Sequence, residues 1–526
     1  MLEWVVERNK AIGRRAAWIR KVVGRWVGRI GLFSAVSGAL CGGLTVAFVA
    51  YRVLHRITPT SDVAAAPIDI TKLALAVVAG VGGVVALVIA YRRQRDVEQS
   101  RFVERFGAAA AQLGASDVAV RIAGVYAMAS VADESDGLRR QQCIDVLCGY
   151  LRLPYTPELG GNHQTKEVLK HPTPDAGSER EQHFEYRQDD REVRKTIVRA
   201  IVAHLRPNAE YIWSASDFDF CTAHFEDSDF NGATFSGDVR FEDATFTDDT
   251  LFGGAKFSGI TSFNNATFSG DAWFKEARFS GITSFDRATF SGDAEFEDAT
   301  FTDDAGFVDA TFSGDARFAD ATFCRDASFR NATFSGDARF VDTTFSRNAL
   351  FGDAKFSLSA WFPNATFSGE AWFANATFSG DTWFKEATFS GDTAFRNATF
   401  SGDTSFKEAT FSGDTAFRNA TFTHDTTFKE ATFSGETSFK EAKFCSDTSF
   451  VGAKFSGITS FDHATFSGDT RFARATFSGI TSFAAPKQWG PPPPMFDWDA
   501  NVTQKPAHVE PQDWPPATAP PSTHGE

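Results

Sequence analysis

The chain has 526 residues, enough for about two to four domains, and a formal net charge of −15. It contains 56 Phe residues but only 3 Met and 7 Tyr, and such a bias toward one aromatic residue indicates an internal repeat. The 6 Cys residues are scattered and form no CxxC pair, which argues against a zinc site or a thioredoxin-like site.

The charge is distributed unevenly along the chain. Residues 1–216 carry a net charge of +7, residues 217–483 carry −19, and residues 484–526 carry −3. A basic first part followed by an acidic second part predicts that the two parts lie in different surroundings.

Residues 1–29 predict a basic amphipathic segment. They contain eight Lys and Arg residues, and Trp18, Val22 and Trp26 would share one face of a helix. We interpret this segment as a helix that lies on an anionic membrane surface, because the tryptophan stripe continues toward an apolar stretch. A nucleic-acid-binding arm has the same charge signature and stays open as the alternative.

Residues 30–91 predict a transmembrane helical hairpin. Gly31–Tyr51 and Leu73–Tyr91 carry no formal charge over 21 and 19 residues, close to the length that crosses a bilayer core. Buried core helices, or a cleaved signal sequence at the first stretch, are the competing interpretations. Lys and Arg concentrate in the outer flanks 1–29 and 92–105, so a two-span protein of the cell membrane would keep both termini and its C-terminal part in the cytoplasm.

Residues 92–210 predict a small all-α domain that serves as a spacer or docking domain. Four segments place apolar residues three or four positions apart, with Ser116 as the expected N-cap of the second and Pro154 ending the third. Residues 154–188 are polar and rich in Pro and Gly, which predicts a loop.

A regular repeat occupies residues 217–484. From Phe235 to Phe483 the spacing between Phe residues alternates between six and five, so the unit has eleven residues. A small residue, usually Ala or Thr, stands two positions before each Phe. Because residues two apart in an extended segment share a face, each half-unit predicts one short strand that buries the Phe beside a small residue.

The coil length follows from the same register. Four sides of five, six, five and six residues make a coil of 22 residues, and residues 380–401 match residues 402–423 at 20 of 22 positions. Phe384, Phe406 and Phe428 would then stack directly on one another as a core ladder.

These units resemble the pentapeptide-repeat family, whose units read small–x–(Leu or Phe)–x–x. The resemblance implies an all-β right-handed four-sided β-helix. The run from Arg121 to Met128 resembles the helical segment that precedes the solenoid in membrane-linked members of that family. The chain departs from the family pattern by a sixth residue in every second unit, usually the Asp of Ser-Gly-Asp. We interpret it as a bulge at a corner, where Gly tolerates unusual backbone angles.

Residues 485–526 are rich in Pro and predict a disordered tail. Trp489, Phe496 and Trp498 could alternatively fold back over the last coil and cover it.

The motifs of catalysis are missing from the sequence. No Ser/His/Asp constellation, metal-ligand spacing or phosphate loop stands out, so we expect no enzyme, cofactor or small-molecule substrate. The leading hypothesis is a membrane-anchored scaffold whose acidic rod binds an unknown protein partner, with the lipid bilayer as its other partner. The candidate docking patch comprises Glu242, Asp243, Asp248, Asp249, Glu295, Glu297 and Asp298.

Two further functions stay open. One branch of the pentapeptide-repeat family mimics DNA as an acidic rod and binds gyrase, so the resemblance implies a topoisomerase inhibitor or protection factor as the alternative. The acidic excess is uneven, however. Residues 217–309 contain 20 acidic and 5 basic residues, whereas residues 310–483 contain 20 acidic and 16 basic residues. A mimic of a DNA duplex would need an even excess along the rod. We therefore expect no direct nucleic-acid binding. A purely structural spacer is the third hypothesis.

Overall fold

The computed structural model describes residues 67–155, 157, 166–172, 179–185 and 190–519, and single helical residues at 41, 45, 48, 49 and 52. The chain divides into two compact units, Met1–Arg105 and Phe106–Glu526.

The described part of the first unit is mainly helix α3 (Pro67–Leu113), which continues into the second unit. The basic segment 1–29 and nearly all of the predicted span Gly31–Tyr51 lie outside the described residues. The second predicted span does not form a helix of its own, because Leu73–Tyr91 continues without a break into the charged residues 92–105 of α3. Among the described residues, no helix combines the length and the apolar character that crossing a membrane requires. The predictions of two transmembrane helices and of a cell-membrane location with a cytoplasmic solenoid are therefore wrong for this part of the chain.

Three helices form a small domain at the start of the second unit: α4 (Val118–Asp133), α5 (Gly137–Leu151) and α6 (Asp190–Leu205). Their contact is partly polar, because the buried guanidinium of Arg121 donates to Asp190 at 2.7 Å and to the hydroxyl of Tyr150 at 3.0 Å. The N-cap of α4 is Asp117, one residue after the predicted Ser116, and its carboxylate accepts from two backbone N–H groups of the first turn.

The predicted loop 154–188 contains a hairpin. Strands β1 (Lys166–Pro172) and β2 (Glu179–Glu185) pair in antiparallel register, with Val168 opposite His183. The two strands are polar and lack the alternation of apolar and polar residues by which strands are recognised in a sequence.

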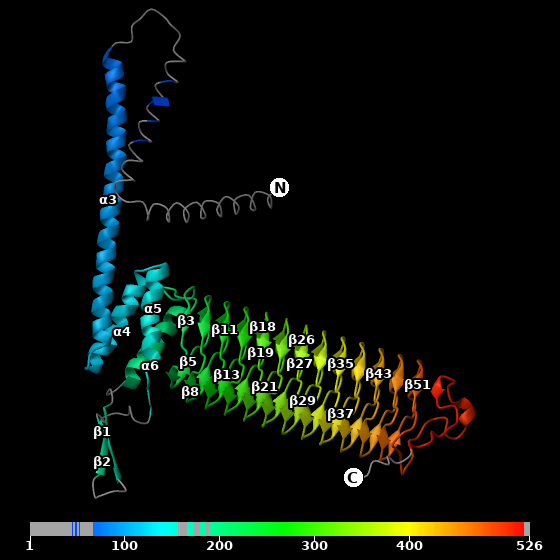
Figure 1. Ribbon diagram of the computed structural model, residues 1–526. Coiled ribbons are helices and arrows are strands. Elements are labelled where there is room, and N and C mark those ends of the chain that lie inside the picture. Colours follow the sequence, from blue (N-terminus) through cyan, green and yellow to red (C-terminus); the bar gives the residue numbers. More distant parts are fainter. Residues whose placement is uncertain are drawn as a thin grey trace, which may run out of the picture. The chain divides into compact units, whose positions relative to one another are not determined.

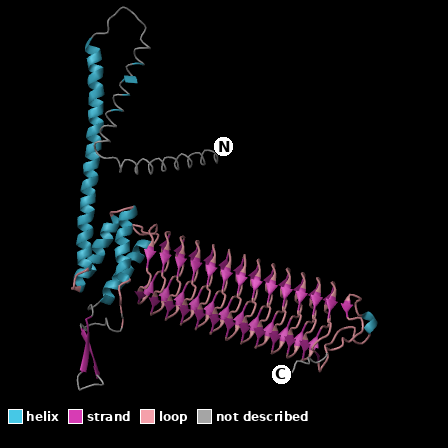
Figure 2. Ribbon diagram, in the orientation of Figure 1, coloured by secondary structure: helices cyan, strands magenta, loops and turns pink. Residues whose placement is uncertain are grey.

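The rest of the second unit is a β-solenoid of the right-handed type, in which four columns of two-residue strands form four faces (Figures 1 and 2). The first face holds β3 (Phe218–Asp219), β7 (Val239–Arg240), the strands from β11 (Thr261–Ser262) to β51 (Thr481–Ser482) at intervals of 22 residues, and β53 (Val509–Glu510). The second face holds β4 (His224–Phe225), the strands from β8 (Thr245–Phe246) to β48 (Thr465–Phe466) at intervals of 22 residues, and β52 (Gln488–Trp489). At the same interval, the third face runs from β5 (Ser228–Asp229) to β49 (Thr470–Arg471), and the fourth from β6 (Thr234–Phe235) to β50 (Thr476–Phe477). The predicted coil of about 22 residues is confirmed.

Stacked phenylalanine rings fill the interior. The rings of Phe384 and Phe406, and of Phe406 and Phe428, lie 5.0 Å apart with planes 2° from parallel. Each ring also meets neighbours around the coil edge to face, as Phe384 meets Phe395 at 5.5 Å and 77°. Parallel-displaced and edge-to-face contacts are the two arrangements that aromatic rings prefer. The small residue two positions before each Phe, such as Thr404 or Ala409, is buried beside the ring.

The sixth residue is accommodated differently from the predicted bulge. Gly402 does not have a positive φ; a Cβ there would lie 2.4 Å from the carbonyl carbon of Gly380 in the preceding coil. Glycine is therefore required for close approach between coils. The left-handed backbone occurs instead at other corners, on non-glycine residues such as Asn397 (φ 57°) and Glu408 (φ 60°). The N–H of the extra residue, Asp403, is bound by the carboxylate of Asp381 at 3.0 Å.

Both ends of the stack are covered. At the start, Trp213 is fully buried and its indole N–H donates to Asp133 of α4 at 2.8 Å. At the other end, the ring of Phe496 stacks on Phe472 at 4.5 Å, and β52, η1 (Val502–Gln504) and β53 follow the last coil. The predicted disorder of the tail therefore does not hold as far as residue 519, because its aromatic side chains cover the open end of the phenylalanine stack.

The contact between coils predicts unequal effects of two Gly→Ala substitutions. Gly402→Ala should lower stability by about 1–3 kcal/mol, because the new methyl group overlaps the backbone of Gly380. Gly352→Ala is the control, since its nearest non-neighbouring atom would be 3.8 Å away; it should be neutral or stabilise by up to about 1 kcal/mol. The measurement is the urea unfolding midpoint by circular dichroism. Equal midpoints for both variants would contradict this interpretation.

Candidate functional site

The second and fourth faces are nearly uniform. Most of their strands read Thr-Phe, with the Phe buried and the Thr half exposed, and a Ser usually follows. These two faces therefore present mainly hydroxyl groups, and one coil differs little from the next.

The first and third faces vary from coil to coil. On the third face the outward residues include Trp273, Glu295, Arg317, Arg339, Trp361 and Trp383. On the first face they include Arg240, Leu350, Trp372, Ala394 and Ala416. The exposed large apolar side chains of the described coils lie on these two faces or at the corners that lead into them: Ile260, Trp273, Ile282, Leu358, Trp372, Ile458 and Ile480.

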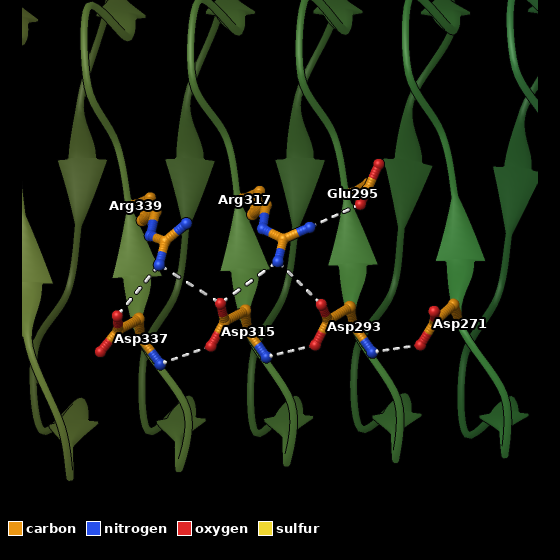
Figure 3. A network of polar contacts seen from close by, with 7 residues as sticks. All are labelled: Asp271, Asp293, Glu295, Asp315, Arg317, Asp337 and Arg339. Carbon is orange, nitrogen blue, oxygen red and sulfur yellow. Dashed lines mark hydrogen bonds and ion pairs between the residues drawn. The ribbon is translucent and has the colours of Figure 1, made fainter.

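A column of carboxylates borders each of these faces. We name the column beside the third face the third-face acidic rail; it contains Asp249, Asp271, Asp293, Asp315, Asp337, Asp381, Asp403, Asp425, Asp447 and Asp469. Seven of these ten carboxylates accept a backbone N–H of the following coil, as Asp293 accepts the N–H of Asp315 at 3.0 Å and Asp315 accepts that of Asp337 at 3.1 Å (Figure 3). Much of the acidic character of the repeat thus has a structural use.

Two arginines neutralise part of this rail (Figure 3). Arg317 lies 2.9 Å from Asp293, 2.6 Å from Glu295 and 3.3 Å from Asp315, and Arg339 lies 3.1 Å from Asp337. Burial opposes the charged form of Arg317, but the surrounding carboxylates outweigh it and raise its pKa. The middle of the third face is therefore a charge-balanced network.

Toward the C-terminal end both faces are hollowed. The groove on the third face, of about 560 Å³, runs over Ser405, Thr427 and Ser449 and is bounded at one end by Trp383. The groove on the first face, of about 480 Å³, runs over Ala394, Ala416 and Ser438 between Trp372 and Ile458. Both grooves arise because small outward residues follow a tryptophan.

The structure distributes the predicted acidic patch over several sides of the rod. Glu242 and Asp243 lie at the corner between the first and second faces, and Asp248 and Asp249 at the corner before the third face. Glu295 lies on the third face and is bound by Arg317. Glu297 and Asp298 lie at the following corner, where Lys275 is 3.4 Å from Glu297. These seven residues therefore form separate groups.

A second acidic cluster, which the sequence did not single out, binds the helical domain. In the first coil, Glu226 lies 2.6 Å from Arg191 and accepts a hydrogen bond from Tyr155 at 2.8 Å. Asp219 in the same coil pairs with Arg152 and Arg240. The sequence signal for this cluster was the presence of basic residues directly after α5 and on α6, followed by an acidic first coil. Part of the acidic excess near residue 220 is thus used within the chain.

Metal binding finds no support in the described residues, among which no group of three or more His, Cys, Asp or Glu is placed to hold an ion. Burial raises the pKa of the Cys143 thiol to about 11, and burial likewise raises that of Cys148. Both thiols are therefore protonated at neutral pH and pack as small apolar groups.

The pairing of Asp219 predicts a pH dependence. Burial would raise the pKa of Asp219, but hydrogen bonds from Cys221 and the charges of Arg152 and Arg240 outweigh it and lower this pKa. Stability from a lowered carboxyl pKa is fully present above the unfolded value of about 3.9 and is lost as the pH falls through the folded value. Asp219→Asn should cost about 1 kcal/mol at pH 7 and progressively less below pH 4. Thermal unfolding of the full chain and of the variant across this pH range measures the loss of stability. A loss that grows on acidification would contradict the lowered pKa of Asp219.

The comparisons with known proteins agree with this architecture. The family model of pentapeptide repeats, which describes nine copies of the repeat, matches seven overlapping segments of the chain between residues 252 and 485. None of the curated proteins and none of the solved structures matches the chain significantly. The matched residues are those that form the phenylalanine-filled coils with four faces. Through residues 252–485, the chain belongs to the pentapeptide-repeat family.

Proposed function

We propose that this protein is a non-enzymatic scaffold that binds a protein partner along the first and third faces of its solenoid. One observation carries the proposal: exposed large apolar side chains are placed on these faces or their corners, whereas the strands of the other two faces repeat Thr-Phe. A rod that served only as a spacer would have no use for this difference.

The tryptophans support a protein as the partner. Trp273 and Trp372 are 38% and 44% exposed, and Trp361 stacks on Trp383 at 5.4 Å in a partly buried pair. Tryptophan and arginine are the residue types that most often dominate the energy of protein interfaces. Both occur here on flat faces whose backbone is held in place by the neighbouring coils.

The chemistry of the outward columns supports a binding role over catalysis. The rail carboxylates accept backbone N–H groups, and Arg317 and Glu295 satisfy each other's charge. Groups that are held in this way as hydrogen-bond acceptors and ion pairs are poorly placed to transfer protons.

The DNA-mimic alternative is disfavoured by the arrangement of charge. A mimic of a duplex needs uncompensated negative charge along its length. Here Arg317 and Arg339 neutralise the middle of the third face, and Lys407 pairs with Glu408 farther along.

Loss of the tryptophans should abolish partner binding. In the source cells, a partner that co-purifies with the full chain should be lost from the Trp372→Ser/Trp383→Ser variant, because both grooves lose their apolar end. The control is Thr388→Ala/Thr399→Ala, which changes the fourth and second faces in the same coils. Mass spectrometry of the purified chains measures the partner. Equal recovery from both variants would contradict the proposal.

The purified full chain should leave the supercoiling activity of gyrase unchanged at micromolar concentrations. A gel assay of plasmid supercoiling tests this expectation. Strong inhibition that disappears on neutralising Glu242, Asp243, Asp248 and Asp249 would favour the DNA mimic over the scaffold.

A further inference from the structure

The groove on the first face separates opposite charges. Its floor consists of the small outward residues Ala394, Ala416 and Ser438. Two positions before each floor residue stands an acid and two positions after it a base, so that the same acid–small–base row occurs in three consecutive coils. The acidic lip is Asp392, Asp414 and Glu436, which line the groove. On the other side Arg396 lines the groove, and Arg418 and Lys440 follow it in the same column; we name these three the basic lip.

The corresponding column of bases on the third face is partly neutralised. There Lys385 and Lys407 pair with the adjacent corner residues Glu386 and Glu408 at 2.9 and 3.0 Å. On the first face the equivalent corner residues are Asn397, Asn419 and Glu441, and the amide N–H of Asn419 donates to the amide oxygen of Asn397 at 3.2 Å. Within the described coils, Arg418 is the one residue of the basic lip that forms an ion pair, with Glu441 at 3.7 Å. Among the described coils, the first-face groove therefore keeps the stronger charge separation.

The spacing of the rows decides what kind of chain fits along them. Adjacent coils are about 4.8 Å apart. Equivalent side chains recur every ~5.4 Å along an α-helix and every ~6.7 Å along an extended strand. Across three rows, the repeat of a bound chain departs from the spacing of the coils by about 1.2 Å for a helix and by about 3.8 Å for a strand. Flexible Lys, Arg and Glu side chains can compensate for the smaller of these two differences but not for the larger.

We propose that the first-face groove binds an α-helix of a partner protein that carries basic residues along one flank and acidic residues along the other. This inference rests on the proposed scaffold function and names the chemistry of its partner. The basic flank faces Asp392, Asp414 and Glu436, the acidic flank faces Arg396, Arg418 and Lys440, and small or apolar residues contact the alanine floor. From Trp372 to Ile458 the groove spans four coil intervals, about 19 Å, which corresponds to about 13 helical residues.

A designed peptide tests the proposal on the full chain. The probe has three heptads with Ala and Leu facing the groove, Lys along one flank and Glu along the other. A second peptide of identical composition alternates Lys and Glu within each flank. Fluorescence of a dye on the peptide measures binding. The segregated peptide should bind at least about tenfold more tightly, because six opposite-charge pairs form only in the segregated arrangement.

Matched variants separate the groove from general electrostatic attraction. Arg396→Glu/Arg418→Glu/Lys440→Glu should weaken binding of the segregated peptide by at least about tenfold. Lys385→Glu/Lys407→Glu/Lys429→Glu makes the same change of charge on the opposite face and should leave binding unchanged. Circular dichroism checks that both variants remain folded.

Orientation gives an independent readout. Exchanging the Lys and Glu flanks of the peptide should reverse its direction in the groove, since the lips keep their sides. Energy transfer from the peptide N-terminus to a dye on the exposed Cys445 detects the reversal, in a chain whose Cys41, Cys221 and Cys324 are replaced by Ser.

The outcomes distinguish this inference from the scaffold function. Equal binding of the two peptides, equal loss in both charge variants, or an unchanged direction after flank exchange would overturn the helix groove. In that case a cellular partner that still depends on Trp372 and Trp383 would leave the scaffold function standing.

Discussion

Phenylalanine rings that lie directly over one another in successive coils are the interaction on which the whole solenoid depends. Burying a side chain of this size contributes about 1.5–3 kcal/mol, and each ring gains its neighbours only if the coil length stays constant. The ring of Phe406 thus meets Phe384 and Phe428 at the same 5.0 Å distance. A constant coil length places residues 22 apart in columns, so that any outward property of the repeat becomes a stripe along the rod.

The same constraint gives the acidic residues their first role. Two sides of each coil hold one residue more than the five of a regular unit, and its backbone N–H needs an acceptor. The carboxylate of the preceding coil supplies it, as Asp392 does for Asp414 at 3.0 Å. Glycine precedes this residue because a Cβ at Gly413 would lie 2.5 Å from the backbone of Gly391. The Ser-Gly-Asp sequence is therefore a device for stacking coils, and a carboxylate that accepts one backbone N–H keeps its negative charge for a partner.

The sequence predicted the solenoid because one signal, the spacing of Phe, controls it. Features that depend on contacts between distant segments were harder to predict from the sequence. The left-handed conformation of Glu408 follows from the turn in which it stands, and glutamate is an unusual residue for it. The covering of Phe472 by Phe496 confirms the alternative prediction that aromatic residues of the tail fold back over the last coil, whereas the proline-rich composition indicated disorder.

For the candidate site, the residue types could be predicted from the sequence but their grouping could not. Acidic residues close in sequence, such as Asp249 and Glu242, lie at different corners, whereas Asp392 and Asp414, 22 residues apart, share one lip of a groove. The apolar stretch 73–91 was interpreted from its composition alone, and within α3 it continues into charged residues. The difference between variable and uniform faces becomes visible only after the chain is wound into coils.

Photo-crosslinking from the four faces of neighbouring coils tests most directly whether the variable faces bind the partner. A photoreactive amino acid is placed in the full chain at Ala394 on the first face, Thr399 on the second, Ser405 on the third or Thr410 on the fourth, and the source cells are irradiated. We expect crosslinks to a protein partner from Ala394 and Ser405 and none from Thr399 and Thr410. Crosslinks of equal yield from all four positions, or from the threonine faces alone, would contradict it.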